Sequence, residues 1–154
     1  MGICKPTDLR LHLAPGQRLM GLDVGEKTIG LAFSDPDLTV ASPRLTLRRR
    51  KFTEDAAQIS EFVRAENVGA LVIGLPVNMD GSEGPRCQST RDFASNLLEK
   101  IDIPVAFWDE RLSTRAVERE MIRADRSRRK RARTIDSQAA AYILQGVLDR
   151  LRHG

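Results

Sequence analysis

The sequence predicts an α/β fold in which a mixed sheet of five strands has helices on both faces. Two apolar runs, residues 18–24 and 28–34, are joined by a short turn containing Gly25, a pattern typical of a β-hairpin. Beyond residue 50, apolar runs alternate with amphipathic segments, which is typical of strands connected through helices. The sheet is therefore expected to be antiparallel at one edge and parallel at the other.

The elements are expected in the order β-β-β-α-β-α-β-α-α. After the hairpin, residues 44–48 alternate polar and apolar side chains, as expected for a half-exposed edge strand. Residues 70–74 are continuously apolar, as in a strand that is covered on both faces. Residues 103–108 form the last expected strand, which ends just before two adjacent carboxylates.

Two helices are expected between the later strands. Thr53 is a candidate N-cap for the first helix, which extends to about residue 67 and ends near Gly69. The second helix covers about residues 86–100. Both segments show apolar side chains at helical spacing, so one side of each helix is expected to pack on the sheet.

The carboxyl-terminal part of the chain is expected to form two more helices. Ser113 is a candidate N-cap for the first of them, and Asp136 for the second. The basic residues 125–134 are expected to break the helical pattern between the two. At the other end of the chain, residues 1–17 are expected to form an irregular extension, followed by one domain of residues 18–154.

The positive charge of the chain is concentrated in two places. The 154 residues include 25 basic and 21 acidic side chains, a net charge of +4. Without the two clusters, the remaining 15 basic and 21 acidic residues would give a net charge of −6. Solvated loops would explain such clusters, but their density favours a polyanionic partner. Their members are Arg48, Arg49, Arg50 and Lys51, and Arg126, Arg128, Arg129, Lys130, Arg131 and Arg133.

Other classes of protein are excluded by what the sequence lacks. No apolar run approaches the roughly 20 residues of a membrane span, and the amino terminus has no apolar signal core, so a cytoplasmic protein without a membrane partner is expected. Its 2 cysteines form neither a disulfide framework nor a zinc site. With 1 Trp, 1 Tyr and 5 Phe, base stacking is expected to contribute less than phosphate contact.

Four carboxylates lie where elements of the predicted fold end or begin. Asp23 closes the first strand, although a turn aspartate that binds the hairpin amides explains it equally well. Asp109 and Glu110 are adjacent at a strand end, so only one of them can face the same way as Asp23. An ion cluster with Arg111 is the alternative for that pair, and helix capping is the alternative for Asp136.

Considered together, these carboxylates favour a metal site. The carboxyl ends of parallel strands open onto one crevice, where Asp23 and Glu110 could meet an Asp136 delivered by a helix start. Three close anions raise one another's pKa, so a divalent cation is the natural partner. Oxygen ligands select Mg²⁺ or Mn²⁺ over zinc. Two such ions about 4 Å apart would activate water and stabilise the leaving oxygen in phosphodiester hydrolysis.

Four motifs resemble the YqgF/RuvX family, whose members are described as Holliday junction resolvases and as pre-16S rRNA nucleases. The motifs occur in the family's order between about residues 19 and 150, so the resemblance covers nearly the whole chain. The matching stretches are 21–25 with 29–32 and 34–35, 74–76 with 78–85, 109–114, and 136–137 with 139–140 and 143–144.

The resemblance implies a ribonuclease H-like fold. It also implies acidic site residues at Asp23, Glu110 and Asp136, arranged as in RuvC-like nucleases. Between Asp109 and Glu110, the family pattern favours Glu110. Thr28 departs from the pattern, because the family usually has Arg there, and a possible phosphate contact at this turn is lost.

Basic and polar side chains around the site are expected to contact backbone phosphates. In the loop of residues 78–85, Asn78 and Ser82 could hold a phosphate beside the metal ions, although a structural Ω-type loop explains the same residues. The expected nucleic-acid contacts are Lys27, Asn78, Ser82, Arg111, Arg128, Arg129, Lys130 and Arg131.

The sequence therefore predicts a metal-dependent nuclease for structured RNA, with the immature ends of 16S ribosomal RNA as the favoured substrate, and a monomer or weak homodimer. A resolvase of branched DNA would use the same chemistry, but as a dimer. A non-catalytic RNA-binding assembly factor is the third possibility. The Asp-x-Gly turn also resembles the phosphate-binding turn of actin- and sugar-kinase-type ATPases, but the chain is too short to supply their second lobe.

Overall fold

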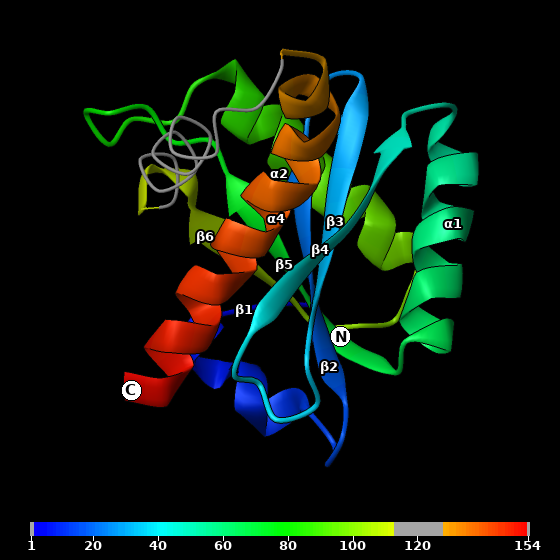
Figure 1. The fold of residues 1–154 in the computed structure, drawn as a ribbon, viewed down its shortest axis with the longest axis vertical. Helices are drawn as coiled ribbons and strands as arrows, with labels where there is room; N and C mark the ends of the chain where they lie inside the picture. Colours follow the sequence, from blue (N-terminus) through cyan, green and yellow to red (C-terminus); the bar gives the residue numbers. More distant parts are fainter. Residues whose placement is uncertain (1, 113–127, 154) are drawn as a thin grey trace.

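The fold is built on one mixed sheet of six strands, in the order β1-β6-β5-β2-β3-β4 (Figure 1). The computed structural model describes residues 2–112 and 128–153, and for residues 128–136 it describes the backbone alone. β1, β6, β5 and β2 are parallel, whereas β3 and β4 are antiparallel, as the sequence predicted. The strands are β1 (Ile3–Cys4), β2 (Arg18–Val24), β3 (Thr28–Ser34), β4 (Ala41–Arg48), β5 (Val68–Leu75) and β6 (Val105–Asp109).

Helices cover both faces of this sheet, which confirms the predicted fold class. The helices α1 (Phe52–Ala65) and α2 (Pro85–Lys100) pack on one face, where Ile59 and Phe93 join Leu22 in a buried cluster. The helix α4 (Arg128–His153) covers the other face, with Leu144 and Val147 among its buried side chains, and lies in front of the sheet in Figure 1. Removing these side chains from water is the main stabilising contribution to the fold.

The amino-terminal residues belong to the sheet and its core, so the prediction of an irregular extension is wrong for residues 3–12. The two residues of β1 pair with the start of β6, which adds the sixth strand. A short 3-10 helix, η1 (Pro6–His12), follows and buries Leu9 completely in the cluster under α4. A two-residue strand and a single buried leucine produce no periodicity, and the sequence pattern therefore missed them.

The last helix begins at Arg128, so the predicted break over residues 125–134 is wrong from residue 128 onward. Asp136 consequently lies inside α4 and not at its start, which removes the predicted N-cap role. Arginine and lysine have high helix propensity, and a run of them continues a helix without any apolar stripe to mark it. The helix predicted to start at Ser113 lies outside the described residues.

Smaller differences concern the ends of elements. The N-cap position of α1 is Lys51 and not Thr53, and no side chain caps it by a hydrogen bond. Asn67, with a φ of 54°, makes the turn after α1, whereas Gly69 lies within β5. Another short 3-10 helix, η2 (Glu110–Leu112), follows β6. In the part of the chain that the structure describes, no helix combines the length and the apolarity needed to cross a bilayer.

Candidate active site

Three strands that run in the same direction bring their carboxyl ends to one edge of the sheet. The register pairs Leu22 of β2 with Ile73 of β5, so Asp23 lies level with Gly74. β6 pairs with the other side of β5, and Glu110 follows it directly. Asp23, on β2, and Glu110, directly after β6, therefore lie on either side of β5 at the same edge of the sheet.

Asp23 and Glu110 also lie on the same face of the sheet, the one covered by α4. A Cβ added to Gly21 would lie 2.8 Å from the backbone oxygen of Ala140, so Gly21 faces α4. Asp23 is two residues further along the strand and shares that face. A Cβ added to Gly74 would lie 2.7 Å from Oε1 of Glu110, so this carboxylate lies directly above the glycine.

Gly74 creates the space in which this arrangement is possible. Besides the carboxylate of Glu110, the Cδ1 methyl group of Ile143 from α4 occupies the space that a side chain at position 74 would need. Asp23 and Glu110 are both half-buried. The result is a cradle at the sheet edge that has two carboxylates, one from each side of a glycine. Sequence reasoning gave Gly74 no role, although a glycine at the end of an apolar strand signals a close approach.

Asp109, the neighbour of Glu110, forms an ion pair with Arg111. The Nη2 atom of Arg111 lies 2.6 Å from Oδ2 of Asp109, and the Arg111 backbone N–H donates to Oδ1 at 2.9 Å. The hydrogen bonds from the Arg111 side chain hold the pKa of Asp109 below its ordinary value. The strand-end ion pair considered from the sequence therefore exists, but it involves Asp109.

Arg111 also anchors the loop that follows β5. Its Nη1 donates to the backbone oxygen of Met79 at 3.3 Å. Within the loop, Nδ2 of Asn78 donates to Oγ of Ser82 at 3.1 Å, and the Ser82 hydroxyl donates to Oδ1 of Asp80 at 2.6 Å. These bonds favour the structural explanation for the loop, since the predicted phosphate-binding side chains hydrogen-bond to other residues of the loop.

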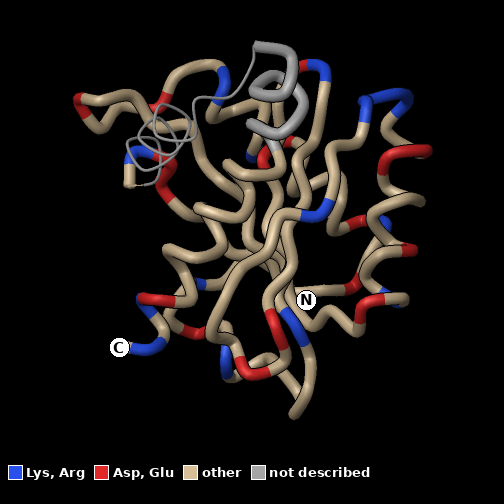
Figure 2. Tube along the Cα trace, viewed as in Figure 1, with Lys and Arg blue, Asp and Glu red and all other residues tan. Residues whose placement is uncertain are grey.

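The β2–β3 turn is tied to the first basic cluster. The backbone N–H of Arg49 donates to the oxygen of Lys27 at 2.8 Å, and Nη1 of Arg49 donates to the oxygen of Gly25 at 2.7 Å. Lys27 itself is exposed. Lys and Arg residues gather at this end of the molecule, above the turn and the link from β4 to α1 (Figure 2). The cationic cluster therefore lies beside the edge that holds Asp23.

The remaining predicted residues lie on the first turns of α4. Asp136 is four residues before Ala140 and seven before Ile143, so its backbone position is on the face of α4 that lies over Gly21 and Gly74. Its side chain is outside the described part, as are those of Arg128, Arg129, Lys130 and Arg131. Among the side chains that are described, no three His, Cys, Asp or Glu residues form a group that could hold a metal ion.

The mixed sheet with helices on both faces defines a class of fold that is also found in RuvC. The structure of Thermus thermophilus RuvC in complex with a Holliday junction substrate matches 90% of this chain and 96% of that one, with a TM-score of 0.55 and 12% identity. The yeast mitochondrial Holliday junction resolvase Ydc2 matches 92% of this chain and 82% of its own, with a TM-score of 0.54 and 12% identity. The fold is therefore ribonuclease H-like, as expected.

The chain belongs to the RuvX family. The model of this family, described as a Holliday junction resolvase, matches residues 17–150. A relative from Roseobacter denitrificans is 62% identical over 148 residues, which are 95% of this chain and 91% of the relative. Another from Rhodospirillum centenum is 57% identical over 159 residues, 100% of this chain and 85% of the relative. Both are named as candidate pre-16S rRNA nucleases.

Proposed function

We propose that this protein is a metal-dependent nuclease that hydrolyses phosphodiester bonds at the ends of pre-16S rRNA during ribosome biogenesis in the cytoplasm. The observation on which the proposal rests is the position of Asp23 and Glu110 on the same face of the sheet, on either side of the strand that carries Gly74. The names of relatives that align with nearly the whole chain support the same activity.

The side chains present fit a hard divalent cation. Asp23 and Glu110 supply carboxylate oxygens, which are the ligands that Mg²⁺ and Mn²⁺ prefer. Because Gly74 has no side chain, the carboxylate of Glu110 can lie directly above the strand that pairs with the strand of Asp23, and Asp136, on the helix face above it, would be the third ligand. Two bound ions would supply an activated water and positive charge for the leaving oxygen. The protein's contribution would be to position the carboxylates from β2, from the residue after β6 and from α4.

The substrate strand would be held by cations on both sides of this cradle. Arg111 is fixed by Asp109 and the loop of residues 76–84, so its guanidinium is pre-oriented near the site. Lys27 lies on the exposed turn that follows Asp23. The other proposed nucleic-acid contacts are Asn78, Ser82, Arg128, Arg129, Lys130 and Arg131. Such contacts bind the backbone without reading the bases, which suits recognition of a structured RNA by its shape.

A DNA junction resolvase is the second candidate function. The description of the family model and the RuvC complex with its junction favour it. Symmetric cleavage of two strands requires a two-fold dimer, whereas one nuclease domain is sufficient to trim an RNA end. We propose a monomer or weak homodimer. A non-catalytic RNA-binding assembly factor is the remaining alternative, in which the carboxylates would serve the fold alone.

Incubation of the purified protein with a precursor 16S rRNA fragment and with a synthetic four-way DNA junction separates these functions. With Mg²⁺ or Mn²⁺, we expect cleavage of the RNA and an intact junction, and with a chelator we expect no cleavage of either. Paired symmetric cuts in the junction, with the RNA untouched, would instead establish a resolvase. Binding of RNA that ignores divalent ions, without cleavage under any of them, would establish the assembly factor.

A further inference from the structure

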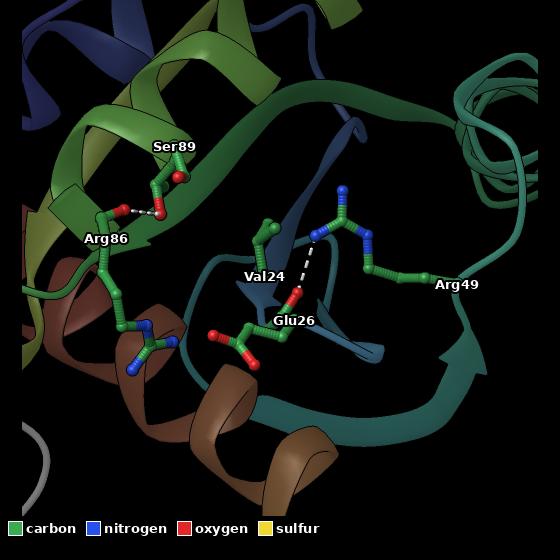
Figure 3. Close-up of a pocket in the computed structure, with 7 residues that line it drawn as sticks. Val24, Glu26, Arg49, Arg86 and Ser89 are labelled. Atoms are coloured by element: carbon green, nitrogen blue, oxygen red, sulfur yellow. Dashed lines mark hydrogen bonds between the residues drawn. The ribbon is translucent and has the colours of Figure 1, made fainter.

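We infer that a pocket on the opposite face of the sheet edge binds a second phosphate group of the substrate, away from the bond that is cleaved; this inference rests on the proposed nuclease function. The pocket has a volume of about 300 Å³ and lies between the β2–β3 turn, the link from β4 to α1, and the first turns of α2 (Figure 3). The lining residues on which the inference depends are Gly25, Glu26, Arg49, Arg86, Ser89 and Thr90.

The pocket is close to the carboxylate cradle but opens on the other face of the sheet. Val24 lines the pocket and belongs to the buried cluster shared with α1 and α2. Its neighbour Asp23 lies on the face of α4, because consecutive strand residues point to opposite faces. Adjacent Cα atoms are only about 3.8 Å apart. A nucleic-acid strand that crosses this edge with one phosphate at the cradle would therefore bring a nearby phosphate to the pocket.

Arg49 is a cation that the fold holds in place. Its Nη1 donates to the backbone oxygen of Gly25 at 2.7 Å, and its guanidinium carbon lies 5.4 Å from the centre of the Phe93 ring. The guanidinium has five N–H donors, so these contacts leave further donors available. An arginine that is already oriented loses little entropy when it binds a phosphate.

Arg86 supplies the second cation and has no structural task that competes with binding. It is exposed, and in the described part of the chain its side chain makes neither a hydrogen bond nor an ion pair. It lies in the first turn of α2, where no acidic residue and no side-chain cap are present. The positive end of the helix adds to the attraction for an anion. Ser89 adds an exposed hydroxyl to the lining, one turn further along.

Two other polar residues of the pocket, Thr90 and Glu26, do not contribute to binding an anion. The Thr90 hydroxyl donates to the backbone oxygen of Arg86 at 2.9 Å, so it supports the helix and is not a free donor. Glu26 is an exposed carboxylate at the pocket, and in Figure 3 its side chain points toward Arg86. Two guanidinium groups and a helix start still leave the pocket net positive, and Glu26 weakens its attraction for an anion.

Arg86→Gln tests the pocket with little risk to the fold. Binding is measured by fluorescence anisotropy of a labelled precursor 16S rRNA fragment in chelator, so that no cleavage is required. We expect affinity to fall about tenfold, as for loss of one charge-assisted contact. The slope of log affinity against log salt should decrease in magnitude by about 0.7. Glu26→Gln should bind more tightly than the unmodified protein. Arg64→Gln, an exposed arginine near the end of α1, is the matched control and should change nothing.

Neutral methylphosphonate linkages identify the phosphate that occupies the pocket. The linkages are replaced one at a time, and substrates with a 5′-phosphate or a 5′-hydroxyl are compared. Neutralising an internal linkage could weaken RNA binding by the unmodified protein but not by Arg86→Gln. That result would place a backbone diester in the pocket. The same pattern for the 5′-end would place a terminal phosphate there.

The outcomes for the pocket and for the nuclease function are separable. The unmodified protein could cleave RNA while Arg86→Gln and Glu26→Gln bind RNA with the affinity of the unmodified protein. In that case the pocket is not a phosphate site and the nuclease function stands. If binding depends on Arg86 and no divalent ion supports cleavage, the phosphate site stands and the nuclease function falls. A loss of RNA affinity in Arg64→Gln as large as that in Arg86→Gln would show a general effect of charge and would overturn the inference.

Discussion

Asp23→Asn is expected to reduce cleavage of precursor rRNA by about a thousandfold or more and to leave RNA binding intact. The substitution keeps the size of the side chain and removes one negative charge. At the proposed site that charge would help to hold a divalent cation, which would supply the activated water and positive charge for the leaving oxygen, so its loss should remove both contributions. Binding should persist, because the proposed phosphate contacts come from basic residues elsewhere.

Single-turnover cleavage at saturating protein, with anisotropy for binding, measures the two effects separately. Asp37→Asn is the control for the change of Asp to Asn, because Asp37 is exposed and lies in the turn between β3 and β4, away from the proposed site. Asp37→Asn should cleave the RNA at the rate of the unmodified protein. Cleavage by Asp23→Asn at that same rate would remove Asp23 from the mechanism, whatever the effect on binding.

Gly74→Ala is expected to reduce cleavage by about a hundredfold while the protein remains folded. The new Cβ would lie 2.7 Å from Oε1 and 3.0 Å from Cγ of Glu110. These atoms, like the Cδ1 atom of Ile143, belong to side-chain ends that can move, so the chain should relieve the overlap by displacing the carboxylate. A methyl group inserted in a tight space costs about 1–3 kcal/mol of stability, and thermal unfolding would measure that cost.

Gly69→Ala controls for this loss of stability, because it makes the same change in the same strand. Its Cβ would lie 2.5 Å from Oε1 of Gln17 and 2.5 Å from Cδ2 of Leu13, which are also side-chain ends. Gly69 is close to the start of β5, at the opposite end of the strand from the carboxylates. It should lose stability comparably and keep its cleavage rate. If Gly74→Ala cleaves the RNA as fast as Gly69→Ala and the unmodified protein, the position of Glu110 above Gly74 is unimportant for the reaction.

Long, strongly patterned elements were predictable from the sequence, whereas short ones were not. The bounds of β2 and β3 agree with the predicted residues 18–24 and 28–34, because each is a full apolar run on either side of a turn. β1 has only two residues and depends on pairing with β6, which lies about a hundred positions later in the chain. The early start of α4 was missed because basic residues form helix without an apolar stripe.

In the candidate site, too, some residues were suggested by the local sequence pattern and others depend on the fold. A charged residue near the end of an apolar strand made Asp23 a candidate site residue, although a turn aspartate explained the local pattern equally well. The distinction between Asp109 and Glu110 needed the family resemblance, and its physical reason, the pairing of Asp109 with Arg111, depends on side-chain geometry. Arg86 had no signal at all. It is a single arginine in a helix, and its relation to Arg49 exists only because the fold brings α2 beside the β2–β3 turn.

Anomalous scattering from crystals of the protein soaked with Mn²⁺, with a short uncleavable RNA bound, tests the central claim most directly. We predict manganese peaks within coordination distance of the carboxylates of Asp23 and Glu110, on the face covered by α4, with Asp136 completing the ligands. The same soak of Asp23→Asn should lose at least one peak. Manganese bound elsewhere on the RNA–protein complex, with none beside these two carboxylates, would contradict the proposed metal site and the nuclease mechanism built on it.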